Sequence, residues 1–267
     1  MVDIPNISEA AVMISKKLSI FLSLIFAISL PLSSCKESAE KPFETLSSIQ
    51  AAGVPEGVDM GEDYIDSFVF FGESTTYHLK NRGVLSGGSD TTQVWGTESG
   101  TAKLDITIKE LRIIFPETNE LMTVGEAAAK KRPERMFLCF GLNGAVGNIK
   151  KGAEHFKTCY RILIDEIKKN SPATEIFLAS AFPVAENMDM SRYTVDVDTL
   201  NSYIATINSW THELANEYGI SYLNVAKPLT DSRGRLCSEY QVGDGHHLTA
   251  EAYRLVLKYI RTHANID

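Results

Sequence analysis

Apolar and polar positions follow two different patterns along residues 61–267. Short apolar runs, typical of buried strands, end or begin beside turn-forming residues, whereas longer segments repeat their apolar positions at helical spacing. The predicted strands are residues 67–71, 92–95, 135–140, 175–181 and 220–225. The predicted helices are residues 125–131, 152–169 and 198–218, with a last helix after Thr249, a favoured N-cap residue. Residues 101–108 and 111–115 also have an extended pattern, but the pattern gives them no place in a sheet.

Alternation of short apolar strands with amphipathic helices favours an α/β domain with a central parallel sheet covered on both faces. In such sheets ligands bind at the carboxyl ends of the strands. Ser74 and Asn143 each follow the end of a predicted strand. We therefore expect the functional site at this edge of the sheet.

The N-terminal region has the pattern of an export signal rather than of a folded domain. Lys16 and Lys17 precede an apolar run of 15 residues, 18–32, which is short for a membrane span of about 20 residues. Ser33 and Ser34 then precede Cys35, and this arrangement resembles the lipobox of bacterial lipoproteins. The resemblance implies cleavage before Cys35 and a lipid on its sulfur.

This interpretation divides the chain into three parts and gives it a location. Residues 1–34 form a lipoprotein signal peptide, residues 35–60 a lipid-anchored tether, and residues 61–267 the folded domain. Residues 1–12 lie ahead of the charged region, so the true start could be Met13. An ordinary secretory signal, in which Cys35 is incidental, is the alternative. The expected location is extracytoplasmic, with the protein anchored to a membrane of the bacterial cell envelope.

The composition limits the classes of partner that the protein is expected to bind. The net charge is −8 and no long basic run occurs, which argues against nucleic acid as a partner. Export places the chain in an oxidising compartment, where Cys139, Cys159 and Cys237 remain after lipidation of Cys35. With three cysteines left, at least one is free or pairs with another chain. No CxxC and no metal-ligand spacing occurs in the sequence, so we expect no metal.

Candidate chemistry lies in two distant segments. Gly72-Glu73-Ser74 follows the first predicted strand at once, and a serine at such a strand-to-helix turn is exposed enough to act as a nucleophile. Near the C-terminus, Asp244 precedes His247 by three residues on a loop before the last helix. Together they predict a triad in the chain order Ser74, Asp244, His247, with His247 as general base and Asp244 orienting its ring. His246 is the competing candidate for the base.

Three short blocks in this order, Phe71-Gly72-Glu73-Ser74, Gly141-Leu142-Asn143 and Asp244-x-x-His247, resemble the signature of the GDSL or SGNH hydrolase family. The resemblance implies a flavodoxin-like three-layer α/β/α sandwich with a central parallel sheet, and a serine esterase or acylhydrolase mechanism without a metal or organic cofactor. It also implies an oxyanion hole formed by the Ser74 N–H, the Asn143 side-chain amide and the backbone N–H of a glycine. Gly100 is the best match for that glycine, with Gly87 and Gly88 as rivals.

Two positions depart from the family pattern. Glu73 stands where the family usually has Asp, and Gly144 follows Asn143 where Asp is common. We expect an exported serine esterase whose substrate is an ester, with O-acetyl groups on a carbohydrate as one candidate. The alternatives are acyl transfer to a sugar hydroxyl at the same site, or a non-catalytic glycan-binding surface lipoprotein, which the two departures motivate.

Overall fold

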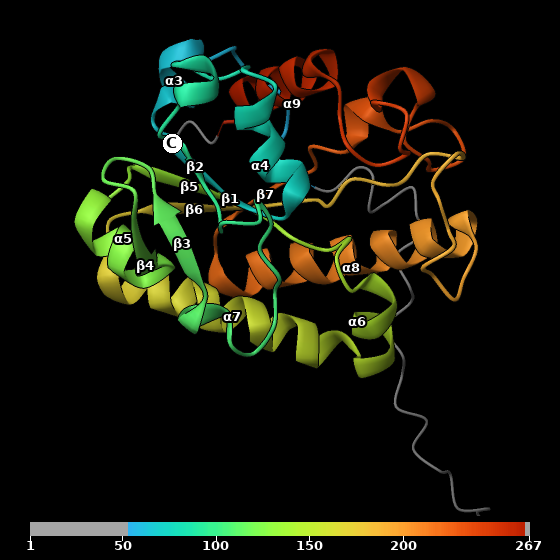
Figure 1. Ribbon diagram of the computed structural model, residues 1–267, viewed down its shortest axis with the longest axis horizontal. Coiled ribbons are helices and arrows are strands. Elements are labelled where there is room, and N and C mark those ends of the chain that lie inside the picture. Colours follow the sequence, from blue (N-terminus) through green and yellow to red (C-terminus); the bar gives the residue numbers. More distant parts are fainter. Residues whose placement is uncertain (1–52, 265–267) are drawn as a thin grey trace, which may run out of the picture. The chain divides into compact units, whose positions relative to one another are not determined.

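The computed structural model describes residues 53–264. Its centre is a five-stranded sheet, in which all paired strands run parallel (Figure 1). The strands are β1 (Phe68–Gly72), β2 (Val94–Trp95), β5 (Arg135–Cys139), β6 (Glu175–Ala179) and β7 (Ser221–Leu223). Their spatial order is β2-β1-β5-β6-β7, which is the order 2-1-3-4-5 of the flavodoxin-like fold. The predicted three-layer α/β/α architecture is therefore confirmed.

Helices cover both faces of this sheet. α3 (Glu62–Asp66), α4 (Ser74–Asn81) and α9 (Ala250–Thr262) pack on one face, and α5 (Val124–Lys131), α7 (Ala153–Asn170) and α8 (Val197–Tyr218) on the other (Figure 1). Successive residues of β1 serve opposite layers, because Phe68 and Phe70 join the first core and Val69 and Phe71 the second. Since both faces are buried, the strand reads as a continuous apolar run.

The helix ends follow local chemistry. Thr123 caps α5 through a reciprocal capping box with Glu126. Asp196 caps the start of α8, and Gly219 ends it in a left-handed conformation with φ 61°. Thr249 caps α9 by accepting a hydrogen bond from the Ala252 N–H, as the sequence predicted.

Residues 101–108 and 111–115 were both expected to be extended, and the structure bears this out only for the second segment. Residues 101–108 form no strand; they run as a loop into a 3₁₀ turn at Ile108–Glu110, so the extended pattern there was misleading. The buried side chains of Ala102, Leu104 and Ile108 explain the pattern, because they pack into the core from a loop. Residues 111–115 do contain a strand, β3 (Arg112–Phe115), which pairs antiparallel with the unpredicted β4 (Glu120–Thr123). The short helix α6 (Ala145–Lys151) was also not predicted.

Contacts to the domain begin before the predicted start near Gly61. The N–H of Val54 donates to the Tyr222 carbonyl, and the N–H of Gly57 donates to the Thr262 carbonyl. Asp59 also pairs with Arg261 of α9. The predicted signal peptide 1–34 and Cys35 lie outside the described residues, as does most of the predicted tether.

The described residues also bear on the cysteines and on membrane spans. Cys139 and Cys159 are buried, Cys237 is half-buried, and all three are free thiols. Within residues 53–264, none of the helices combines the length and apolar character needed to cross a bilayer.

Candidate active site

Ser74 is placed by the end of strand β1, which lies between β2 and β5 in the sheet. Gly72 ends that strand beside Cys139 of β5, and a Cβ added at Gly72 would lie 2.3 Å from the Cys139 carbonyl oxygen and 2.5 Å from Thr76 Oγ1. Only glycine fits there, so the chain can turn sharply and begin α4 at Ser74. The Ser74 side chain therefore lies at the N-terminus of a helix, where the helix dipole favours developing negative charge.

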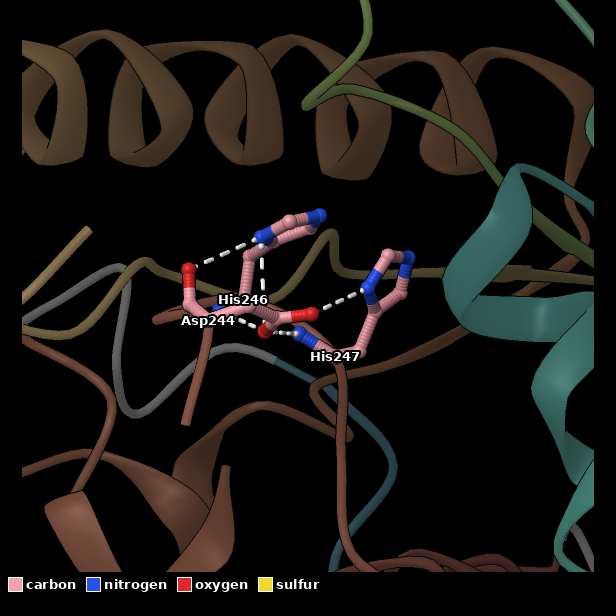
Figure 2. Close-up of side chains that lie close together, drawn as sticks. All are labelled: Asp244, His246 and His247. Atoms are coloured by element: carbon pink, nitrogen blue, oxygen red, sulfur yellow. Dashed lines mark hydrogen bonds and ion pairs between the residues drawn. The ribbon is translucent and has the colours of Figure 1, made fainter. Parts of the chain in front are cut away.

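His247 and Asp244 come from the loop that precedes α9. His247 Nε2 lies 3.1 Å from Ser74 Oγ, and His247 Nδ1 lies 2.7 Å from Asp244 Oδ2. Figure 2 shows the Asp244 carboxylate between the His247 ring and the loop backbone, with its dashed contact to the ring nitrogen. The structure thus brings together, across 173 residues of sequence, the three side chains that the sequence proposed as a triad.

Backbone bonds hold this loop in place. The Val242 N–H donates to the His247 carbonyl, and the Thr249 N–H donates to the Tyr240 carbonyl, so the loop closes like a hairpin. Arg82, just after α4, donates from Nε to the Leu248 carbonyl at 3.1 Å. That bond ties the histidine loop to the end of the helix that begins at Ser74.

The charge on Asp244 is strongly favoured. Burial alone would raise the pKa of Asp244, but hydrogen bonds from the backbone N–H groups of His247 and His246 and from the His247 ring hold it well below its usual range. The carboxylate therefore stays ionised at neutral pH and can stabilise a protonated His247.

His246 points elsewhere. Its Nδ1 lies 3.2 Å from the Asp244 carbonyl oxygen, and the contact to Ser74 is made by His247. Donor atoms of Asp244, His246 and His247 do lie within 4.8 Å of one another, so the three could hold a metal ion (Figure 2). Both ring nitrogens of His247 are already engaged, one by Asp244 and one by Ser74, which is an arrangement for proton transfer.

Glu73 anchors the loop that carries Asn143. Its buried carboxylate accepts hydrogen bonds from the N–H groups of Gly141, Leu142 and Asn143 at 2.9, 3.1 and 3.0 Å. Burial raises the pKa of Glu73 to about 7, and the three N–H donors oppose that rise. The departure from Asp thus places a longer side chain against three successive backbone amides close to Ser74.

Asn143 and the Ser74 backbone converge on one point. Asn143 Nδ2 and the Ser74 N–H both donate to Thr101 Oγ1, each at 3.1 Å. Gly100, beside Thr101, is buried and adopts φ 72°, but its N–H donates to the Thr97 carbonyl at 2.9 Å rather than toward Ser74. Its role as an oxyanion donor stays a prediction.

Two site residues escaped the sequence reasoning. Thr101 directly follows the predicted Gly100, and its contacts to Ser74 and Asn143 span 27 and 42 residues. His78 stacks on His247 with ring centroids 4.3 Å apart. Only its spacing could have signalled it, because a residue four positions after Ser74 lies on the same face of a helix.

Comparison with known families shows the family of the chain. The model of the GDSL-like lipase/acylhydrolase family matches residues 70–255, which is more than half of the chain. The chain belongs to this family, and it is accordingly a hydrolase that acts on esters. No curated protein matches the chain.

Solved structures share the fold at low identity. A GDSL-like lipase from Bacteroides thetaiotaomicron VPI-5482 is 17% identical, with a TM-score of 0.50 over 80% of this chain and 92% of that protein. A protein from Bacteroides fragilis NCTC 9343, assigned as an acylhydrolase, is 16% identical, with a TM-score of 0.50 over 82% and 94% of the two chains. At these identities the likeness concerns the fold alone.

Proposed function

We propose that the protein is a serine esterase in which Ser74 is the nucleophile, His247 the general base and Asp244 the residue that orients the base. The observation that carries this proposal is the unbroken chain of contacts from Ser74 Oγ through His247 to Asp244, at 3.1 and 2.7 Å. Such a chain lets one proton move between the nucleophile and the ring while the carboxylate stabilises the charged ring.

The reaction proceeds in two halves. Ser74 Oγ attacks the ester carbonyl carbon while His247 Nε2 takes the hydroxyl proton, which gives a tetrahedral intermediate. His247 then returns that proton to the departing alkoxide, the alcohol leaves, and an acyl-serine remains. Water, deprotonated by His247, attacks the acyl carbon and releases the acid, and the proton returns to Ser74.

The Ser74 N–H and the Asn143 amide are the proposed donors to the oxyanion. Both donors point at one place beside Ser74, and donors aimed in this way at developing negative charge contribute strongly to catalysis. Loss of Asn143 Nδ2 in Asn143→Ala should therefore lower kcat by roughly 10²–10³-fold.

The two departures from the family pattern are compatible with a working site. Glu73 accepts three backbone hydrogen bonds from the Asn143 loop. Gly144 adopts φ 81° as the N-cap of α6, a conformation that an Asp side chain would make strained. Glu73 and Gly144 therefore fit the local backbone of this site, and neither residue needs loss of activity as its explanation. This favours the esterase over a non-catalytic glycan-binding module.

Steady-state hydrolysis of p-nitrophenyl acetate tests the proposal. We expect Ser74→Ala and His247→Ala each to lower kcat by about 10³-fold or more. His246→Ala is the matched control, because it removes the neighbouring ring without touching Ser74, and it should retain activity within about tenfold. If His246→Ala is the inactive variant and His247→Ala is active, the assignment of the base is wrong.

We further infer that the enzyme is exported, carries a lipid on Cys35 and acts at the cell envelope, where acetylated glycans are candidate substrates. The inference rests on the order Lys16-Lys17, apolar run, Cys35. Intact-mass analysis of membrane-extracted protein should give a chain beginning at Cys35 with added lipid. An unmodified Cys35 in a soluble product would end the idea. Acetate release from acetylated glycans, compared with acetate release from simple acetyl esters, tests the substrate class separately.

A further inference from the structure

Thr101 occupies the place where a substrate oxygen would have to bind. The Ser74 N–H and Asn143 Nδ2, the two proposed oxyanion donors, both direct their hydrogens at Thr101 Oγ1, at 3.1 Å each. A tetrahedral oxyanion needs the same donors at 2.7–3.1 Å. The Thr101 hydroxyl and an oxyanion held by both donors would therefore occupy the same volume, and each excludes the other.

The backbone around Thr101 is fixed on both sides. The Thr101 carbonyl accepts a hydrogen bond from Thr97 Oγ1 at 2.7 Å, and the N–H of Ala102 donates to the Gly72 carbonyl at 3.2 Å. Gly100 closes the turn before it through its bond to Thr97. A movement that clears the site consequently requires rotation of the Thr101 side chain about Cα–Cβ, between staggered rotamers, rather than loop displacement.

Two hydrogen bonds hold the Thr101 side chain in its place. The hydroxyl accepts two hydrogen bonds from neutral donors, and within the described part of the chain no acceptor is found for its own proton. Thr101 is also partly exposed, so its side chain has solvent beside it. Two ordinary hydrogen bonds correspond to about a 30-fold preference for the closed arrangement.

We propose that Thr101 is a gate of the oxyanion hole, an internal ligand whose hydroxyl closes the hole at rest and must rotate away before an ester carbonyl can bind. The proposal rests on the proposed roles of Ser74 and Asn143. Only the open fraction of molecules is competent, so the gate lowers the apparent reactivity toward any carbonyl or phosphoryl reagent by that fraction.

The test compares Thr101→Ala, Thr101→Ser and the wild type in the full-length protein. The readout is the second-order rate of covalent labelling by a small alkyl fluorophosphonate, in which the Ser74 oxygen replaces fluoride on phosphorus and the phosphoryl oxygen enters the hole. Thr101→Ala removes the hydroxyl and should label about 3- to 30-fold faster than the wild type. Thr101→Ser keeps a hydroxyl at the same place and should stay within about threefold of the wild type. Thermal unfolding checks that each variant is folded, and Thr101→Gly, which lacks the same hydroxyl, takes the place of an unfolded Ala variant.

The outcomes distinguish a failure of the gate from a failure of the proposed function. Labelling at Ser74 that the Ala variant does not accelerate overturns the gate and leaves the proposed function standing. Slower labelling of the Ala variant, with a normal rate for Thr101→Ser, also overturns the gate, because the hydroxyl would then assist the reaction as a donor. An unlabelled wild type with a labelled Ala variant supports a tightly closed gate. No labelling of either folded protein overturns the gate together with the proposed function.

Discussion

The imidazole of His78 lies flat against the imidazole of His247, with 4.3 Å between ring centroids and 9° between ring planes. Helix α4 therefore contributes Ser74 at its first residue and the neighbour of the proposed base one turn later. Burial, followed by the charges of His247 and Arg82, lowers the pKa of His78 to about 4. His78 is thus neutral at neutral pH, and it places an uncharged ring beside His247, the proposed general base.

This stack predicts a loss of stability in acid. Because the pKa of His78 falls from 6.5 to about 4 on folding, the unfolded chain binds more protons between these values. The contribution of His78 to the free energy of unfolding is therefore present above pH 6.5 and is lost as the pH falls toward 4.

His78→Phe keeps a stacked ring without a titrating group. Urea unfolding at pH 7 and pH 5 should show a smaller acid loss for this variant than for the wild type. His155→Phe, in α7 on the other side of the sheet, is the control, and an equal acid loss in His78→Phe and the wild type would contradict the prediction.

For Glu73 we expect the opposite pH dependence of the free energy of unfolding. Its pKa rises from 4.5 to about 7 on folding, so the folded state binds more protons in this window and stability falls as the pH rises through it. A shift of this size corresponds to about 3 kcal/mol in the free energy of unfolding. Glu73→Gln cannot titrate, so its free energy of unfolding should lack this dependence on pH. The difference in unfolding free energy between wild type and variant should therefore change in favour of the variant from pH 5 to pH 8. A difference that does not vary with pH would show that the pKa of Glu73 is the same in both states.

The same substitution should also lower activity. Gln offers one acceptor oxygen where Glu73 offers two, and its NH₂ group would face one of the three N–H groups of residues 141–143. The loop that carries Asn143 then loses a bond, and we expect kcat to fall by roughly tenfold with a smaller change in KM. Glu73→Asp, which keeps the charge and shortens the side chain, separates the effect of charge from that of reach. Unchanged kcat in Glu73→Gln would show that Glu73 does not position Asn143.

Thr249 should stabilise the last helix and, with it, the histidine loop. Its Oγ1 caps α9 by accepting from the Ala252 N–H at 3.2 Å, and its own N–H donates to the Tyr240 carbonyl. Thr249→Ala should cost about 1 kcal/mol in the free energy of unfolding, whereas Thr249→Ser should cost much less. Denaturant titration of the three proteins measures this, and equal losses in both variants would show that the hydroxyl is not the stabilising group.

Much of the sheet could be predicted because its strands are buried on both faces. β1 is a continuous apolar run, and so are β5 and β6 after their first residues, Arg135 and Glu175. Each of these predictions was right to within two residues at either end. The β3–β4 hairpin was only half recognised, because β4 has four residues and only Met122 among them is buried. Residues 101–108 were misread, since alternating buried residues in a loop imitate a strand.

The candidate site, like the sheet, has parts that the sequence predicts and parts that it does not. Ser74, Asn143 and the Asp244–His247 pair could be located because each follows a strand or precedes a helix, and topology brings such junctions to one edge of the sheet. The placement of Thr101 could not be foreseen, because it depends on how a loop outside the regular elements packs against Ser74. The three bonds from residues 141–143 to Glu73 likewise depend on backbone directions that no local pattern encodes.

The proposed triad depends on the contact between Ser74 and His247, and covalent labelling of Ser74 tests this contact. Full-length wild-type protein, treated with a fluorophosphonate and digested, should give a single modified peptide with the adduct on Ser74. The adduct should be missing from Ser74→Ala and strongly reduced in His247→Ala, while His246→Ala keeps it. An adduct on another serine, or equal labelling of wild type and a folded His247→Ala variant, would contradict the proposed triad.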